Sequence, residues 1–307
     1  MVDSFWCNIE IIIFAIVFYI PAWSNMLAKE IYTRLDNDFI KSGISDDWYR
    51  YMTELEPFIC DNFKNRDMGL VCDFTETINS VYTAVFPSEK VLRKVLENAE
   101  NAMVFSHHAS AWDLKKSPVG FYLMDASLLE MLKKKNISLY CLHHPLDNYS
   151  EYSTSKTLAD ALDIEIIKPF ANYSGAVCGV IGKTKCKTIN ELHSKYSAAV
   201  GHETKLYQYG NSEIPNNMVA VCAGGGNQVF IVEEMIENNI KALITGITVK
   251  ADHSAEVHTL EQKNQINIIG GTHYSSEKFA CMAMCKYFSK LGLPAEFIED
   301  EPCFEDM

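Results

Sequence analysis

Short apolar runs alternate with amphipathic stretches along most of this chain. Residues 102–105 form an apolar run of strand length, and residues 137–142 form the next predicted strand. Between them, residues 124–135 repeat apolar side chains at helical spacing, which predicts a helix with one buried side. A second helix is predicted over 152–162, followed by a short strand over 164–167.

The second half of the chain repeats this alternation. The predicted strands cover residues 218–222, 242–245 and 265–269, and the predicted helices cover 229–238, 254–263 and 273 to about 291. Strands and helices that alternate through short connections predict an α/β fold, with mixed, largely parallel sheets flanked by helices. In such sheets ligands bind beyond the carboxyl ends of the strands.

The N-terminus carries an unbroken apolar run over residues 11–20. This run is too short to span a bilayer comfortably, because about 20 apolar residues are needed. An export signal is one interpretation, but Asp3 and Glu10 precede the run where a signal carries Lys or Arg. A membrane anchor, a packed helix or strand, and translation from Met26 are the alternatives that the sequence leaves open.

Composition narrows the classes of partner. With 307 residues and a hydrophobic fraction of 48%, the chain can bury a core in one large domain or two modest ones. The formal net charge of -13 repels phosphate backbones, so we expect neither nucleic acid nor a membrane as partner. The ten cysteines lack a CxxC pair, which predicts reduced thiols and a cytoplasmic location rather than a disulfide framework.

Histidines gather in segments that follow predicted strands. Five of the nine histidines lie in three segments, namely His107-His108, His143-His144 and His273. His107, Asp147 and His273 each fall shortly after a predicted strand, where α/β sheets place their ligand sites. Adjacent histidines are commonly solvated loop residues, but their recurrence at successive strand ends favours a shared site.

His273 and Glu277 add a carboxylate to this set. They are four residues apart at the start of a predicted helix, so both side chains project from one helix face. Such a pair is often a surface salt bridge, but it can also bind one metal ion or straddle two. Imidazole and carboxylate ligands without cysteine suit Zn, Mn, Fe, Ni or Co and do not distinguish among them.

A run of three glycines, Gly224-Gly225-Gly226, separates a predicted strand from a predicted helix. Converging backbone N–H groups at a helix N-terminus can hold a substrate phosphate. Tight strand–helix packing explains the same glycines, and the run is neither a GxGxxG motif nor a Walker loop.

Taken in order, the motifs resemble the NIF-three-like dinuclear metal-centre family, which is catalogued as GTP cyclohydrolase I type 2-like. The resemblance rests on the His-His pair at 107–108, on LHHPLD at 142–147 and on GTHYSSE at 271–277. Supporting matches are DMGL at 67–70, AVCAGGG at 220–226 and ITG at 244–246, so the resemblance covers residues from about 67 to 291. Ala109 stands where the family usually has Pro, and the loop after it changes the entrance to the site.

The resemblance implies which residues bind metal. Two divalent ions would be held by His107, His108, Asp147, His273 and Glu277, with Glu277 as the bridge. His143 would line the site, where we expect it to relay a proton as the catalytic residue.

The resemblance also implies a protomer of two α/β halves with the metal site in the cleft between them. We place these halves at residues 45–170 and 171–307, after an apolar segment and helix over 1–44. Members of the family usually assemble as rings, commonly hexamers, so we expect a homo-oligomer.

Two functions are compatible with such a site. One is a metal-dependent hydrolase that acts on a nucleotide or a related small molecule. The other is a non-enzymatic metal-binding ring that serves as an interaction or regulatory protein, or as a metal carrier. A blocked cleft would favour the second function, and Trp112, near the His-His pair, could block it.

Overall fold

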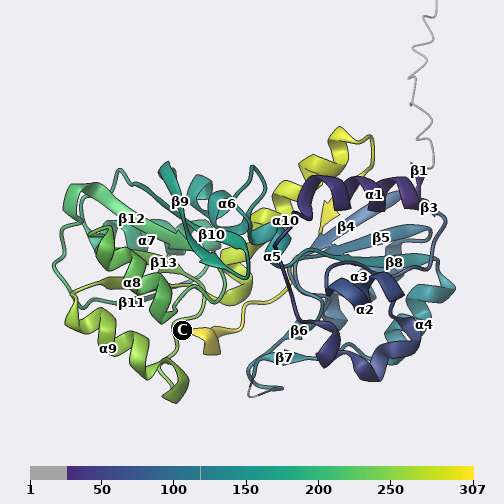
Figure 1. The fold of residues 1–307 in the computed structure, drawn as a ribbon, viewed down its shortest axis with the longest axis horizontal. Helices are drawn as coiled ribbons and strands as arrows, with labels where there is room; N and C mark the ends of the chain where they lie inside the picture. Colours follow the sequence, from purple (N-terminus) through teal and green to yellow (C-terminus); the bar gives the residue numbers. More distant parts are fainter. Residues whose placement is uncertain (1–25, 118) are drawn as a thin grey trace, which may run out of the picture.

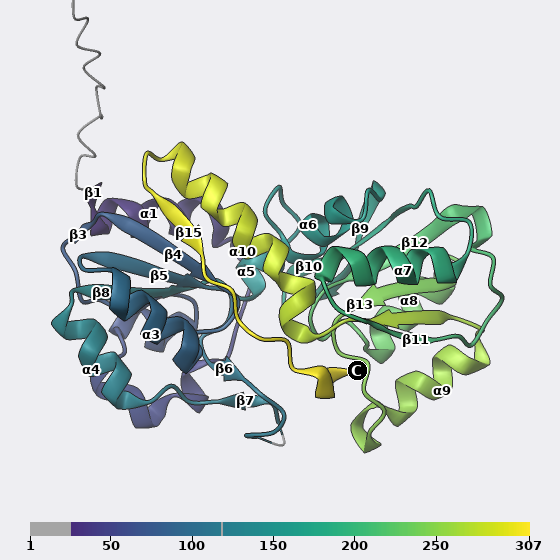
Figure 2. The same ribbon diagram turned by 180° about the vertical axis from the view of Figure 1, so that it is seen from behind.

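The computed structural model describes residues 26–117 and 119–307, so the apolar run predicted over 11–20 lies outside the described residues. Two sheets lie side by side, each flanked by helices, with helix α10 (His273–Lys290) between them (Figures 1 and 2). This arrangement confirms the predicted α/β class with mixed sheets. None of the helices in the described part of the chain is long and apolar enough to cross a membrane.

The first sheet has five strands in the order β15-β4-β5-β8-β2. All neighbouring pairs are parallel except the edge pair of β2 and β8. The strands are β2 (Gly69–Cys72), β4 (Ser80–Ala84), β5 (Ala102–Ser106), β8 (Ile137–Cys141) and β15 (Ala295–Phe297). The helices of this half are α1 (Ala28–Phe39), α2 (Asp61–Arg66), α3 (Glu89–Asn98) and α4 (Ala126–Lys134).

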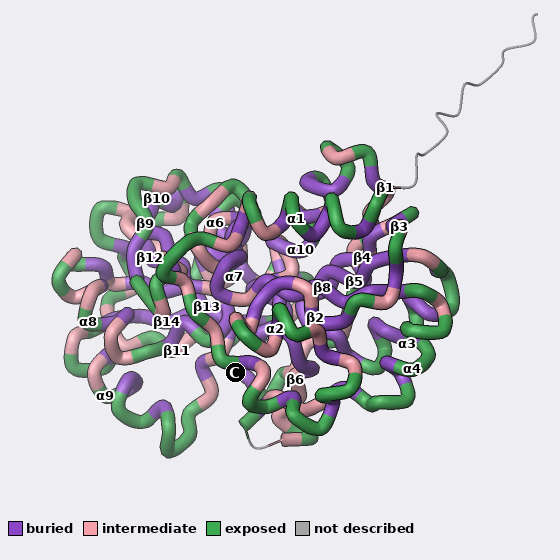
Figure 3. The backbone as a smooth tube through the Cα atoms, turned by 45° about the vertical axis from the view of Figure 1, so that its right-hand side comes forward, coloured by how far each residue is buried: buried purple, intermediate pink, exposed green. Residues whose placement is uncertain are grey.

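Both faces of the first sheet are covered. Helices α2, α3 and α4 pack on one face around Val104 and Leu139, and α1 and α10 pack on the other around Phe105. Every residue of β5 and β8 is buried, as the purple stretches at these labels show (Figure 3). Burial on both faces explains why these two strands carry continuous apolar runs rather than an alternating pattern.

The second sheet has six strands in the order β11-β14-β13-β12-β10-β9, of which β12, β13 and β14 are parallel. Helices α6 and α7 cover one face, and α8 and α9 cover the other. The strands are β9 (Glu165–Tyr173), β10 (Ala176–Lys183), β11 (Lys205–Tyr207), β12 (Met218–Cys222), β13 (Ala242–Thr245) and β14 (Asn267–Gly270). The helices are α6 (Thr154–Ala161), α7 (Ile189–Val200), α8 (Val229–Glu237) and α9 (Ala255–Lys263).

The β9–β10 hairpin is the main departure from the sequence pattern, which predicted only a short strand over 164–167. Strand β9 continues to Tyr173 and pairs antiparallel with β10. Most β9 side chains are exposed or half-buried, because the strand lies at the edge of the sheet, so no apolar run marked its length.

Short elements complete the described chain. Strands β1 (Met26–Leu27) and β3 (Thr77–Ile78) pair with each other, as do β6 (Ala111–Trp112) and β7 (Phe121–Tyr122). A four-residue helix, α5 (His144–Asp147), follows β8. The 3₁₀ helices are Tyr49–Tyr51, Thr53–Phe58, Pro215–Asn217, Asp252–Ser254 and Phe304–Asp306.

The C-terminal part of the chain returns to the first sheet. Strand β15 pairs with β4, and Ala280, Met284 and Phe288 of α10 belong to the apolar cluster on the α1 side of that sheet. The predicted halves at 45–170 and 171–307 remain a proposed division, in which α10 and β15 connect the second half to the first sheet. The proposed boundary lies within β9.

Phe288 tests the packing of α10 on the first sheet. Its ring is fully buried and meets the Phe105 ring edge-on, with centroids 5.5 Å apart. We expect Phe288→Ala to lower the free energy of unfolding by about 3–5 kcal/mol, because the truncation leaves a cavity. Urea denaturation followed by circular dichroism measures this loss. Met282→Ala, on the exposed side of the same helix, should change it by less than about 0.5 kcal/mol, and equal losses would contradict the packing argument.

Candidate metal centre

The His-His pair follows β5 directly. His107 and His108 extend the pairing of this strand, since their backbone N–H groups donate to the carbonyls of Ala84 (3.1 Å) and Val85 (2.9 Å). The His107 ring is oriented by a hydrogen bond from Nδ1 to the carbonyl oxygen of Leu142, at 2.9 Å. Its Nε2 atom is therefore the one that faces the centre, where it has no hydrogen-bond partner.

Helix α10 supplies the HxxxE pair. The Thr272 side chain caps this helix by accepting a hydrogen bond from the Ser275 N–H at 3.1 Å. One helical turn then brings His273 Nε2 to within 3.3 Å of Glu277 Oε1. Both side chains are buried, so the pair is not a surface salt bridge.

Glu277 joins α10 to the His-His pair of the first sheet. Its Oε2 atom lies 2.9 Å from His108 Nε2, and its Oε1 atom lies 3.5 Å from His107 Nε2. Asp147, at the end of α5, approaches from another side, with its Oδ1 atom also 3.5 Å from His107 Nε2. The Thr154 hydroxyl donates to the same Asp147 oxygen at 2.6 Å and holds this carboxylate in position.

The structure thus brings the five predicted ligands together. Their ligand atoms form two groups of three, each with its atoms within 4.8 Å of one another: one is His108, His273 and Glu277, and the other is His107, Asp147 and Glu277. Both groups contain Glu277. Imidazole nitrogens and carboxylate oxygens are ligands that suit a divalent transition metal or zinc. The Nε2 atom of His107 has no hydrogen-bond partner among the described residues, so it is available to bind such an ion.

Burial and charge oppose each other in this centre. Burial alone would lower the pKa of His107, but the carboxylates of Glu277 and Asp147 outweigh it and raise the pKa to about 9. Burial alone would raise the pKa of Glu277, but the neighbouring histidines, His273 first, hold it well below its usual range. For His108 desolvation prevails and keeps the pKa well below its usual value. The raised pKa means that His107 holds a proton beside the Glu277 carboxylate. A metal cation that binds His107 would displace this proton.

His143, predicted as the catalytic residue, lies beside the five ligands and is more accessible than they are. Its Nε2 atom is 4.0 Å from Asp147 Oδ2, and its ligand nitrogen groups with those of His107 and His108. Its side chain is 20% exposed, whereas those of His107 and His108 are at most 1% exposed. Desolvation keeps the pKa of His143 well below its usual value, so the imidazole is neutral.

Asp46 orients the His143 ring, and the sequence analysis did not identify this role of Asp46. The His143 Nδ1–H donates to Asp46 Oδ1 at 2.7 Å, and the backbone N–H of His144 donates to Asp46 Oδ2 at 3.2 Å. Burial raises the pKa of Asp46 to about 6, because the attraction of His144 offsets only part of the desolvation. No local motif marks Asp46, since its partner lies 97 residues further along the chain.

Aromatic rings surround the histidines. Phe86 stacks on His108 with centroids 4.6 Å apart, and Trp112 meets His273 edge-on at 4.5 Å. The Trp112 Nε1–H donates to Asp306 Oδ1 at 3.0 Å, and Asp306 Oδ2 accepts from the His273 backbone N–H at 2.7 Å. Trp112 therefore covers the centre on the His273 side, held there by the C-terminal segment.

The glycine turn packs directly against the centre. Gly224 has φ +65°, and a Cβ atom there would lie 2.1 Å from Glu277 Oε1. A Cβ atom on Gly226 would lie 2.3 Å from the carbonyl oxygen of Cys222. Close packing therefore accounts for these two glycines, whereas a Cβ atom on Gly225 would meet nothing within 4 Å.

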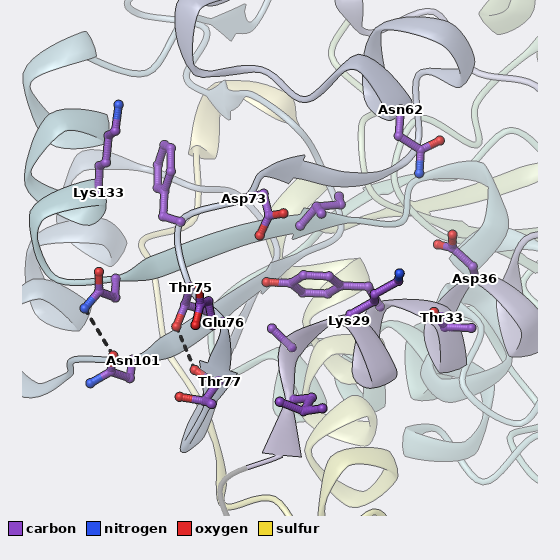
Figure 4. Close-up of a pocket in the computed structure, with 16 residues that line it drawn as sticks. Lys29, Thr33, Asp36, Asn62, Asp73, Thr75, Glu76, Thr77, Asn101 and Lys133 are labelled. Atoms are coloured by element: carbon purple, nitrogen blue, oxygen red, sulfur yellow. Dashed lines mark hydrogen bonds between the residues drawn. The ribbon is translucent and has the colours of Figure 1, made fainter.

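A cavity of about 1160 Å³ lies elsewhere, beside α1 (Figure 4). Charged side chains of both signs line it, including Asp73, Glu76, Lys29 and Lys133. Its described lining contains no histidine and none of the residues of the metal centre. Its size alone therefore does not make it a candidate for metal chemistry.

The chain matches one family of known proteins. The sequence profile of Duf34/NIF3 (NGG1p interacting factor 3) matches residues 46–302. A protein of Borreliella burgdorferi called GTP cyclohydrolase 1 type 2 homolog is 28% identical over 225 residues, which cover 73% of this chain and 84% of that protein. A protein of Pyrococcus horikoshii with the same name is 28% identical over 244 residues, covering 78% and 90%.

Solved structures share the fold. The protein ybgI, described as of unknown function, superimposes with a TM-score of 0.70 at 20% identity, covering 91% of this chain and all of that one. Reduced HcgD from Methanocaldococcus jannaschii gives a TM-score of 0.63 at 20% identity, covering 90% of this chain and 99% of that one.

Gly224 tests how closely the turn must approach Glu277. We expect Gly224→Ala to destabilise the fold by about 1–2 kcal/mol, the usual cost of a left-handed residue with a Cβ atom. Because the new methyl group would also displace Glu277, the metal bound per chain should fall, as measured by elemental analysis. Gly225→Ala is the matched control, and metal loss in both variants or in neither would contradict the proposed contact.

Asp46 tests the support of His143. We expect Asp46→Asn to weaken metal binding by about tenfold, the lower end of the usual outer-shell effect, because the His143 ring that Asp46 holds groups with His107 and His108 and lies 4.0 Å from Asp147. Competition with a chromophoric chelator measures this change. Asp47→Asn, which removes an adjacent but exposed carboxylate, should leave the affinity unchanged. An unaltered affinity in Asp46→Asn would show that Asp46 does not support the centre.

Proposed function

The chain belongs to the Duf34/NIF3 family, and from this premise we propose that it binds two divalent metal ions and acts as a metal-dependent hydrolase. The proposed substrate is a nucleotide or a related small molecule, in keeping with the name GTP cyclohydrolase 1 type 2 homolog of its curated relatives.

One observation carries the proposal for two ions. Two groups of three ligands share a single carboxylate, Glu277, and each group has enough donors for one ion. The Oε1 atom of Glu277 faces His273 and His107, and its Oε2 atom faces His108. Oε1 thus lies near one histidine of each group, and a carboxylate that contacts both groups suits a bridge between two ions.

The protein residues around the centre have separate roles in this proposal. His107, His108, Asp147, His273 and Glu277 would hold the ions. When bound, two such ions supply Lewis acidity that polarises a C–N or P–O centre and activates water. His143 would accept or donate a proton at Nε2, because Asp46 binds its Nδ1–H and it is the accessible histidine of the group.

A second cavity supports this role for His143. This cavity of about 490 Å³ is lined by His143 together with Trp48, Phe121, Tyr122 and Arg50. Its volume is within the range of small-molecule sites. Its aromatic rings would accommodate a planar ring such as a nucleobase, whereas its charges are mixed, because Asp46 and Asp47 also line it and Arg50 is paired with Asp47.

The alternative is a non-enzymatic metal-binding ring that serves as an interaction or regulatory protein, or as a metal carrier. The observation in its favour is the cover of aromatic rings, with Trp112 against His273 and Phe86 against His108. In that case the protein would bind metal tightly and turn over no nucleotide or phosphoester. For either function we propose a homo-oligomer, with the hexameric ring usual for the family as the expected state, which sedimentation velocity would measure.

Elemental analysis of the purified protein tests the centre. We expect about two ions per chain in the wild type, and loss of both in a His108→Ala, Glu277→Ala double variant, because the change removes a ligand of one group and the shared carboxylate. Glu237→Ala, which removes an exposed carboxylate from α8, is the control and should retain the metal. A wild type that stays folded but metal-free after reconstitution with Mn, Zn and Fe would refute the proposal.

A screen of nucleotides and phosphoesters then separates the two functions. We expect hydrolysis by the metal-loaded wild type and a rate about 100-fold lower in His143→Ala, the usual loss when a proton-transfer residue is removed. Metal content should be measured in the same samples, so that loss of the ions is not mistaken for loss of proton transfer. A protein with two ions but no turnover would support the non-enzymatic alternative.

A further inference from the structure

A cavity of about 500 Å³ adjoins the metal centre at Trp112. Trp112 and Leu114 of the β6–β7 segment line it from the first half, and the start of α8 and the segment after β13 line it from the second. The β6–β7 hairpin and α9 lie on the same side of the molecule, toward the lower edge of the view (Figure 1). Trp112 also contacts His273, so one indole ring borders both the cavity and the metal centre.

Asn227 is the unusual residue of this cavity. The residue is 8% exposed, yet neither Oδ1 nor Nδ2 has a hydrogen-bond partner among the residues that the structure describes. The hydroxyl of Thr248, which also lines the cavity, is buried and has no partner either. Buried polar groups are almost always paired, so a donor and an acceptor left free together indicate a ligand that supplies both.

The backbone beside Asn227 is open as well. Gln228, the residue before the first turn of α8, makes no side-chain capping bond to the N–H groups of that turn. Gly225 borders the cavity, and a Cβ atom there would meet nothing within 4 Å. These features leave room for a group in contact with Asn227.

The described lining carries no fixed positive side chain that would favour a phosphate as the main ligand, and its one imidazole is that of His253. No lysine or arginine occurs among the described residues of this cavity, whereas Glu256 contributes a carboxylate. The remaining walls are largely apolar and include Trp112, Ile247 and Val257. Apolar walls with a few convergent polar groups are typical of sites for uncharged planar ligands.

We propose that this cavity binds a nucleobase-like ring that carries a hydrogen-bond donor and an acceptor on neighbouring positions. The Asn227 carboxamide pairs with that edge, its Oδ1 accepting from a ring N–H or amino group and its Nδ2 donating to a ring oxygen or nitrogen. The ring lies against the apolar walls that include Trp112. The site shares Val119 with the cavity at His143 but has its own polar group in Asn227, and it does not require hydrolase activity.

Isothermal titration calorimetry on the full chain tests this site with three nucleosides. Inosine and adenosine present a donor next to an acceptor, whereas purine riboside has the same ring shape and sugar but no ring donor. We expect inosine or adenosine to bind about tenfold more tightly than purine riboside, since a two-bond pairing discriminates by at least that factor. In Asn227→Leu, which keeps the side-chain volume, this difference should vanish.

Gln262→Leu, which removes an exposed carboxamide outside the cavity, is the control and should retain the tenfold preference. Equal affinity for the three nucleosides in the wild type, no binding of any of them, or a preference that survives in Asn227→Leu would each overturn the proposal. Metal content is measured in the same samples. Normal metal content without nucleoside binding refutes the nucleoside site but not the metal centre. Absence of metal together with an intact nucleoside preference refutes the metal centre but not the nucleoside site.

Discussion

The carboxylate of Glu277 is the group around which the two parts of the structure are organised. It is buried on α10, yet its partners His107 and His108 stand at the end of β5 in the first sheet. An ionised carboxylate removed from water is costly unless charged or hydrogen-bonding groups compensate it. The position of α10 between the two sheets is therefore tied to the chemistry of this one side chain as well as to apolar packing.

The residues around the Glu277 carboxylate are consistent with a buried charge that needs compensating groups. Gly224 lets the turn after β12 approach Glu277, and Phe86 and Trp112 exclude water from the histidines. A site of low polarity strengthens every charge interaction within it, which is why His107 and Glu277 shift their pKa values in opposite directions. The same surroundings favour a multivalent cation, since it would neutralise the carboxylates and take the place of the proton that His107 holds.

The two sides of the centre differ in character. On one side His143 is accessible and held by Asp46, beside a cavity with aromatic walls and a guanidinium group. On the other side Trp112 is fixed through Asp306, beside a cavity that holds the unpaired Asn227. Catalysis is proposed for the first side and recognition of a ring for the second, and Trp112 connects them through its contact with His273.

The sequence by itself determined the α/β class, the central strands β5, β8, β12, β13 and β14 with the helices α4, α8, α9 and α10 beside them, and the five candidate metal ligands. Continuous apolar runs marked β5 and β12, and the HxxxE spacing marked the start of α10, because these signals arise from neighbouring residues. The length of β9 was missed, since an edge strand exposes most of its side chains and lacks an apolar run. Tertiary structure alone decided which side chains support the centre: Asp46 reaches His143 from 97 residues away, and Asp306 reaches Trp112 from 194 residues away. Contacts between residues so far apart in the sequence depend on how the sheets and helices pack, and no pattern among neighbouring residues predicts that packing.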